Sequence, residues 1–270
     1  MAPFRLEGRT AVITGAASGI GAALASALAT RGCRLALADI DEAALATIAA
    51  RHARNGLHVT QMKVDVASLH DIKAFATAIE RDHAGVDLLF NNAGVALAGS
   101  FEDIAIEDFE WLINVNFLGV VRMTRALLPL LRRAEESRIV NVSSLFGIIA
   151  PAGQTAYAAS KFAVRGFSDA LRHELRGSSI GVTTVHPGGV KTDIARRAIE
   201  RQKLPAAQRD NAVKRSERLL RMAPEKAADI ILRAVEKRQP RVLVGADAKI
   251  AALVERLAPA NYWSLLGGRN

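Results

Sequence analysis

The stretch TAVITGAASGIGAALASALATRGCRLALAD, residues 10–39, carries the strongest fold signal in the chain. Its apolar, β-branched start at 10–15 predicts a short buried strand, and the spacing of 20–32 predicts a helix that stops at Gly32. A second apolar run at 33–39 predicts another strand. Two strands joined by one helix form a βαβ unit with parallel strands.

Three glycines, Gly15, Gly19 and Gly21, occupy the turn between that first strand and first helix. Their spacing is GxxxGxG, which differs from the GxGxxG dinucleotide fingerprint. Glycines at either spacing allow a tight turn and close approach of a phosphate to the backbone. Gly15 permits a tight turn, while Gly19 and Gly21 allow a pyrophosphate to approach the free N–H groups of the helix. A tightly packed turn without a ligand is the alternative.

The rest of the chain continues the alternation of strands and helices. Strands are predicted at 57–65, 86–94, 138–144, 180–188 and 241–245. Helical segments are predicted at 41–56, 68–83, 102–114, 117–135, 155–176, 224–238 and from Ala246 onward, with a basic helical insertion at about 191–222. This order predicts one doubly wound α/β domain over 1–270, with a parallel seven-stranded sheet and helices on both faces. Ligands of such folds bind at the carboxyl ends of the strands.

Composition excludes several classes of protein. The chain of 270 residues has one cysteine, Cys33, so it forms no internal disulfide, and it shows no secretory signal or long apolar span. A cytoplasmic enzyme is expected, and no residue cluster has the spacing of metal ligands.

The net charge is +9, and residues 194–222 contribute nine basic and three acidic side chains. A solvated helix face, an acidic substrate or an anionic membrane would explain this excess; nucleic acid is not expected, because interleaved aromatics and recognition motifs are missing.

Asp39 ends the second predicted strand. A carboxylate there can accept hydrogen bonds from both adenosine ribose hydroxyls and would repel a 2′-phosphate. No Lys or Arg lies in the glycine motif or directly after Asp39. NAD is therefore expected rather than NADP. Capping of the next helix is the alternative role for Asp39, although Asp41 could do this equally well.

Seven short motifs then occur in a fixed order: TGAASGIG (14–21), Asp65–Val66, NNAG (91–94), Asn116, VSS with Ser144, YxxxK (157–161) and HPGGVKT (186–192). This set resembles the short-chain dehydrogenase/reductase family over nearly the whole chain to about residue 190. The resemblance implies a single Rossmann-type domain and a nicotinamide cofactor. It implies Ser144, Tyr157 and Lys161 as a catalytic triad, with Asn116 in a proton relay. The implied cofactor-binding residues are Gly15, Ser18, Gly19, Ile20, Gly21, Asp39, Ile40, Asp65, Val66, Asn92, Ala93, Gly94, Tyr157, Lys161, Pro187, Gly188, Val190 and Thr192.

The spacing of Tyr157 and Lys161 suits proton transfer. A tyrosine phenol has a pKa near 10, too high for a base at neutral pH. A cation one helical turn away, together with an oxidised nicotinamide, favours the phenolate, so a lowered pKa of Tyr157 is expected. Ser144 would hydrogen-bond the substrate oxygen, and Lys161 could also donate to the nicotinamide ribose.

These residues predict an NAD(P)-dependent oxidoreductase that interconverts a secondary alcohol and a ketone. Apolar residues near the motifs favour a hydrophobic, steroid-like or aryl/alkyl substrate: Val95, Leu97, Leu145, Phe146, Ile148 and Ile149. The family places a mobile substrate lid at about 191–222, whose basic side chains would suit an acidic substrate. A dinucleotide-sensing module without turnover is the alternative function, and an isomerase, dehydratase or epimerase on the same scaffold is a further one.

The resemblance also implies a homodimer or homotetramer built from the helices at 117–135 and 155–176. The C-terminal extension, about 246–270, carries Ile250, Leu253, Val254 and Leu257 at helical spacing. A core or subunit interface would explain it, as would a peripheral membrane contact together with the basic segment. His186 is expected only to end its strand.

Overall fold

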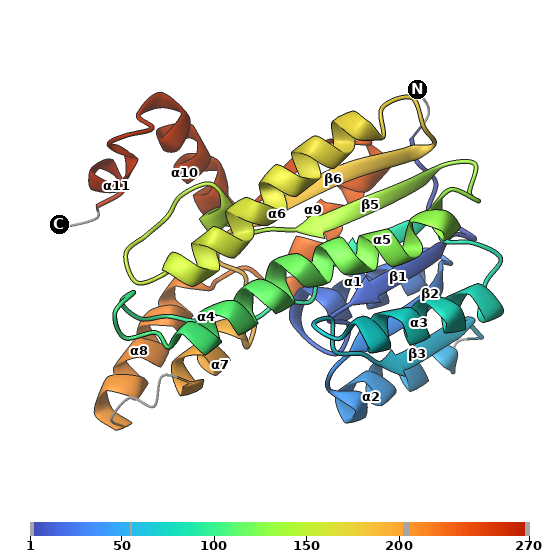
Figure 1. The fold of residues 1–270 in the computed structure, drawn as a ribbon, viewed down its shortest axis with the longest axis horizontal. Helices are drawn as coiled ribbons and strands as arrows, with labels where there is room; N and C mark the ends of the chain where they lie inside the picture. Colours follow the sequence, from blue (N-terminus) through green and yellow to red (C-terminus); the bar gives the residue numbers. More distant parts are fainter. Residues whose placement is uncertain (1–2, 55, 202–205, 268–270) are drawn as a thin grey trace.

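The computed structural model describes residues 3–54, 56–201 and 206–267. Its centre is one parallel sheet with the strand order β3-β2-β1-β4-β5-β6-β7 (Figure 1). The strands are β1 Thr10–Thr14, β2 Arg34–Asp39, β3 Val59–Lys63, β4 Leu88–Asn91, β5 Ser137–Val142, β6 Ile180–Pro187 and β7 Arg241–Val244. The predicted doubly wound α/β fold with seven parallel strands is confirmed. The order reverses between β1 and β4, which is the switch point where such folds bind ligands.

The helices lie on both faces of the sheet. They are α1 Gly19–Thr30, α2 Glu42–Ala53, α3 Leu69–Asp82, α4 Ile106–Ile113, α5 Gly119–Leu131, α6 Thr155–Glu174, α7 Ile194–Arg201, α8 Ala206–Leu219, α9 Pro224–Glu236, α10 Ala246–Leu257 and α11 Tyr262–Leu265. A π-helical segment, Asn114–Leu118, joins α4 to α5 without a break, and a single 3-10 turn, Leu145–Gly147, follows β5. The predicted break between helices at 114–117 is therefore absent. Among the described residues, no helix is long and apolar enough to cross a bilayer.

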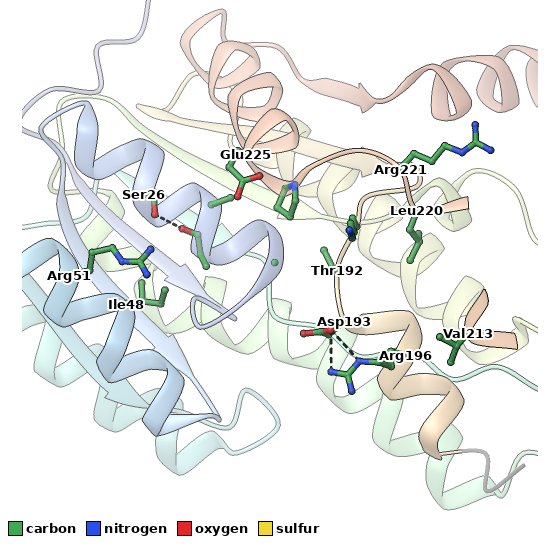
Figure 2. A pocket seen from close by; sticks show the side chains of 15 residues that line it. Ser26, Ile48, Arg51, Thr192, Asp193, Arg196, Val213, Leu220, Arg221 and Glu225 are labelled. Atoms are coloured by element: carbon green, nitrogen blue, oxygen red, sulfur yellow. Dashed lines mark hydrogen bonds and ion pairs between the residues drawn. The ribbon is translucent and has the colours of Figure 1, made fainter. Parts of the chain in front are cut away.

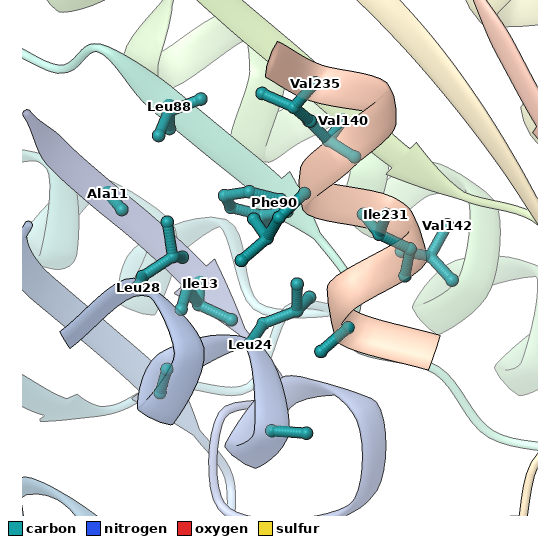
Figure 3. Packing of buried hydrophobic residues seen from close by; sticks show 14 of the residues in the cluster. Ala11, Ile13, Leu24, Leu28, Leu88, Phe90, Val140, Val142, Ile231 and Val235 are labelled. Carbon is teal, nitrogen blue, oxygen red and sulfur yellow. The ribbon is translucent and has the colours of Figure 1, made fainter. Parts of the chain in front are cut away.

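Alternate strand residues supply the two halves of the core, because successive side chains of a strand point to opposite faces. On one face, Leu24 and Leu28 of α1 pack with Phe90 of β4 and Ile231 of α9 (Figure 3). On the other face, Leu89 of β4 packs with residues of α3 and α5. Burial of both faces explains why the strands read as nearly continuous apolar runs.

Leu24 is fully buried in the first of these clusters. Replacement of Leu24 by alanine should lower the free energy of unfolding by about 3 kcal/mol, because it removes buried methyl groups and leaves a cavity. Urea denaturation followed by circular dichroism measures this change. Leu69→Ala is the matched control, because Leu69 is 54% exposed at the start of α3, and it should change stability by less than about 0.5 kcal/mol. Equal effects of the two substitutions would contradict the packing described.

Candidate active site

The glycine turn after β1 is joined directly to the NNAG turn after β4. The Asn92 Nδ2 atom donates to the carbonyl oxygens of Thr14 and Gly15, each at 3.0 Å. The backbone N–H groups of Asn92 and Ala93 donate to Thr14 Oγ1 at 3.1 and 3.0 Å. Gly15 has a φ of +65°, and a Cβ atom there would lie 2.8 Å from Ala93 Cα. Only glycine therefore allows the two turns to approach this closely.

The start of α1 is arranged to receive an anion. Ser18 makes no side-chain capping bond, and the first turn of α1 has no acidic residue, so the first N–H groups of the helix remain available to a phosphate. A Cβ atom on Gly19 would lie 2.9 Å from Thr192 Cγ2, and one on Gly21 would lie 1.9 Å from the Gly15 carbonyl oxygen. Thr192 therefore lies against the glycine turn.

A cavity of about 850 Å³ opens beside this turn. Figure 2 shows it between α1 and α2 on one side and residues 191–225 on the other. Its charged lining residues are Arg51, Lys191, Asp193, Arg196, Arg221 and Glu225. The cavity reaches Gly19 and Thr192, but its lining does not include the side chains of Ser144, Tyr157 and Lys161. Basic side chains around the start of α1 fit an anionic ligand.

Asp39 anchors the glycine turn to the end of β2. Its carboxylate accepts hydrogen bonds from the backbone N–H groups of Ala17 at 2.9 Å and Asp41 at 3.0 Å. Asp41 caps α2 by accepting from the Ala44 N–H at 3.0 Å. The alternative in which Asp39 caps this helix is therefore wrong. Next to Asp39, Ile40 is 59% exposed.

The pair Asp65–Val66 follows β3 at the same edge of the sheet. The Asp65 carboxylate accepts from the Ala67 N–H at 2.8 Å. Val66 is buried against Gly119, where a Cβ atom would lie 3.1 Å from the Val66 side chain.

Asn116, in the π-helical segment, fixes the backbone that follows the NNAG turn. Its Oδ1 atom accepts from the Val95 N–H at 2.8 Å, and its Nδ2 atom donates to the Val95 carbonyl at 2.9 Å and to Ser160 Oγ at 3.1 Å. A Cβ atom on Gly94 would lie 3.2 Å from Asn116 Oδ1 and 3.4 Å from Lys161 Nζ. The side chains of Asn116 and Lys161 therefore both lie close to Gly94.

Ser144, Tyr157 and Lys161 lie together at the carboxyl end of β5. Lys161 is buried, and its Nζ atom donates to the Val142 carbonyl at 3.1 Å. The same Nζ atom lies 5.6 Å from the centre of the Tyr157 ring. Ser144 lies close enough to Tyr157 to lower the pKa of its phenol, and Phe146 packs edge-on against the Tyr157 ring, with 6.0 Å between ring centres. The structure thus places Ser144, Tyr157 and Lys161 close together.

The lowering of the Tyr157 pKa that is expected beside an oxidised nicotinamide does not occur in the protein without ligand. Burial raises the pKa of Tyr157, and the hydrogen bond with Ser144 only partly opposes this rise. Burial also lowers the pKa of Lys161 to about 8. The i, i+4 spacing places the ammonium 5.6 Å from the centre of the phenol ring, and removal of water from each group favours its neutral form.

His186 contacts the backbone of Ser144, which the sequence analysis did not predict. It is fully buried at the end of β6, and its Nδ1 atom lies 2.9 Å from the Ser144 carbonyl oxygen. Burial lowers the pKa of His186 to about 4, so the ring is neutral at pH 7 and its Nδ1–H donates to that carbonyl. Because β5 and β6 pair in parallel with Val142 opposite Val185, the register of the two strands could have indicated this contact.

The loop after Ser144 packs on the C-terminal segment. The Tyr262 hydroxyl accepts from the Ala150 N–H at 3.0 Å. Ile148 and Ile149 are buried in a cluster with Ala251 and Tyr262. The C-terminal segment therefore covers both isoleucines. Of the other apolar residues that favour a hydrophobic substrate, Phe146 contacts Tyr157, and Val95 and Leu97 belong to a cluster that also includes Tyr157.

Several cations of residues 194–222 are paired within the protein. Arg196 bonds Asp193 and Glu200, at 3.2 and 2.9 Å. Arg201 bonds Asp108 and lies 4.0 Å from the centre of the Trp111 ring. Lys203, which also contributes to the positive charge of this segment, lies outside the described residues. Among the described residues, no group of three or more His, Cys, Asp or Glu side chains could hold a metal ion.

Comparison with known proteins agrees with this arrangement. The family model for short chain dehydrogenases matches residues 9–203. SadH of Mycobacterium tuberculosis, named as an oxidoreductase, is 42% identical over 266 residues, which cover 96% of this chain and 94% of SadH. Oxidoreductase UcpA of Salmonella typhimurium is 37% identical over 202 residues, covering 74% of this chain and 76% of UcpA.

A solved structure shows the same fold. A short-chain dehydrogenase/reductase from Burkholderia phymatum, crystallised in complex with NAD, matches with a TM-score of 0.87 and 30% identity over 95% of both chains. The family match spans the residues that build the glycine turn, the NNAG turn and the Ser144–Tyr157–Lys161 cluster. The chain therefore belongs to the short-chain dehydrogenase/reductase family.

Proposed function

We propose that the protein is an NAD-dependent oxidoreductase that interconverts a secondary alcohol and a ketone. The observation that carries this proposal is that Ser144, Tyr157 and buried Lys161 lie close together at the carboxyl end of β5, with Lys161 Nζ 5.6 Å from the centre of the Tyr157 ring. The names of SadH and UcpA and the NAD complex of the Burkholderia phymatum relative support the same reaction class. A screen of secondary alcohols and ketones with NAD and NADP, followed by absorbance of the reduced cofactor, tests it.

The residues around the switch point fit a dinucleotide. The approaches of 2.9 Å at Gly19 and 1.9 Å at Gly21 leave no space for a Cβ atom, and the site at Gly94 is tight. The start of α1 offers N–H groups to a pyrophosphate. Asp39 would accept hydrogen bonds from the adenosine ribose. Residues proposed to hold the remaining cofactor groups are Ser18, Ile20, Ile40, Asp65, Val66, Asn92, Ala93, Pro187, Gly188, Val190 and Thr192. The bound nicotinamide would supply the hydride chemistry, and the protein would supply orientation and proton transfer.

Proton transfer is assigned to Tyr157. In the ligand-free protein, burial keeps this phenol protonated, so it can donate to a carbonyl oxygen that Ser144 also contacts. In the direction of alcohol oxidation, the phenol has to lose its proton first. The Lys161 ammonium then favours the phenolate, and a shift of 2–3 pKa units would need about 3–4 kcal/mol of differential stabilisation.

Asn116 is proposed to take part in the proton relay that serves Tyr157 and Lys161. Its side-chain amide is engaged on both sides by Val95, so a proton relay at this position would run through other atoms of the residue. The side chain itself would hold Gly94 and Val95 against the cofactor.

The substrate is proposed to be hydrophobic. Phe146 and Val95 bring apolar surface to the Tyr157 ring. Residues 191–222 would act as the substrate lid, and the internal ion pairs of Arg196 and Arg201 reduce the charge available to an acidic substrate. We also propose a homodimer or homotetramer built through α5 and α6, as the family resemblance implies.

Tyr157→Phe should lower turnover by about 10²–10⁴-fold, because it removes the proton donor and acceptor. The affinity for NADH, measured by fluorescence titration, should change by less than about tenfold, because at most one hydrogen bond to the cofactor is lost. Tyr262→Phe is the matched control and should retain most of the activity. If Tyr157→Phe kept a tenth of the wild-type rate, Tyr157 would not be the proton-transfer group. NADH binding without turnover by the wild type would favour the sensing module.

Asp39→Asn should shift cofactor choice towards NADP. The substitution keeps the size of the side chain but removes the charge that repels a 2′-phosphate and strengthens the ribose hydrogen bonds. The ratio of kcat/KM for NAD to kcat/KM for NADP should fall by about tenfold or more. Asp41→Asn, which changes only the helix cap, should leave the ratio unaltered. An unchanged ratio in Asp39→Asn would place the ribose elsewhere.

His186→Phe should lower kcat by about tenfold while KM for NADH stays nearly constant, because the donor to the Ser144 carbonyl is lost. His186→Gln offers an N–H group again and should recover part of kcat. Steady-state kinetics, together with thermal unfolding of both variants, separates positioning from stability. A His186→Phe variant with reduced stability but normal kcat would show a purely structural histidine.

A further inference from the structure

Helix α10 turns its largest apolar side chains away from the protein. Ile250, Leu253 and Leu257 follow one another at i, i+3 and i+7 and are 59%, 57% and 75% exposed. The side of α10 that packs on the protein carries alanines instead, and Ala248 and Ala251 are buried. Such a contiguous apolar face in water indicates that another surface covers it.

The charged residues of α10 are divided between its two sides. The Asp247 carboxylate accepts from the Gly189 N–H at 2.6 Å, and half-buried Glu255 interacts electrostatically with Arg241 of β7. Lys249 and Arg256 are exposed. Both acidic side chains of α10 therefore have partners within the protein, and the remaining charged residues of the helix, Lys249 and Arg256, are basic and exposed.

The end of the basic segment lies beside the start of α10. The backbone N–H groups of Arg221 and Met222 donate to the Gly189 carbonyl, both at 3.0 Å, and Gly189 in turn bonds Asp247. Leu219, the last residue of α8, is 68% exposed. Figure 1 shows α8 and the α10–α11 pair at the same end of the molecule.

We define the C-terminal face by its exposed apolar and basic residues. These are Arg218, Leu219, Arg221, Lys249, Ile250, Leu253, Arg256, Leu257 and Leu265.

We propose that the C-terminal face docks onto the surface of an anionic lipid bilayer. Exposed leucine and isoleucine side chains beside lysine and arginine are the residues with which an interfacial helix binds lipid. The net charge of +9 attracts an anionic surface and opposes approach of a second copy through this same basic face. If the proposed function holds, docking would bring residues 191–222 to a surface where lipophilic alcohols accumulate.

Flotation with lipid vesicles tests the proposal. The wild type should float with vesicles of equal parts phosphatidylglycerol and phosphatidylcholine, and less with phosphatidylcholine alone. The double variant Leu253→Gln, Leu257→Gln should lower the bound-to-free ratio by about tenfold or more, because burial of one leucine already contributes that much. Lys249→Glu with Arg256→Glu should weaken binding to the anionic vesicles, as should high salt. Leu69→Gln, at an exposed leucine on α3, is the matched control and should float like the wild type.

Three results would overturn the proposal. The first is a wild type that does not float with the anionic vesicles. The second is a double variant that has an unchanged circular dichroism spectrum and floats as well as the wild type. Alternatively, analytical ultracentrifugation would show an oligomer that the double variant dissociates, which would assign the face to a second copy. Flotation requires no turnover, so its outcome does not depend on the proposed reaction.

Discussion

The burial of an ammonium group beside a phenol constrains the rest of the site. Lys161 is 3% exposed, and burial lowers its pKa to about 8. Within the described part of the chain, no carboxylate forms an ion pair with Lys161. Its Nζ atom donates a hydrogen bond to the Val142 carbonyl. A protonated lysine in this position is costly, and that cost falls when a neighbouring phenol ionises. The pair is therefore arranged so that a negative charge on Tyr157 relieves an unfavourable positive one.

The surrounding loops hold that pair in place from several strands. Ser143 Oγ donates to the Lys161 carbonyl at 2.8 Å, and His186 donates to the Ser144 carbonyl. Asn116 holds Val95, and the C-terminal Tyr262 accepts a hydrogen bond from Ala150. Each contact joins a segment that follows a strand to another part of the chain, so the doubly wound sheet determines the geometry. A site assembled from rigid elements in this way loses little entropy when it binds ligands.

Local sequence predicts most of the fold because the helix and strand periods differ and each strand is buried on both faces. The glycine spacing and the ordered motifs also predict where the site residues meet. Contacts between distant segments could not be predicted: nothing near Ala150 indicates Tyr262, and nothing near Asn116 indicates a π-helical segment bonded to Val95. The upward shift of the Tyr157 pKa in the free protein could not be predicted either. The spacing of the two residues identifies the neighbouring ammonium, but it does not show how much water is excluded from the two groups.

The most direct test of this account is an ultraviolet titration of the Tyr157 phenol. The chain has only two tyrosines, so the phenolate absorbance of a Tyr262→Phe variant reports Tyr157 alone. In the free protein the pKa of Tyr157 should lie above the usual value near 10. Saturation with NAD⁺ should lower it by about one unit or more, while NADH, which lacks the nicotinamide charge, should lower it less. A pKa that is already low in the free protein, or one that does not respond to NAD⁺, would contradict the account.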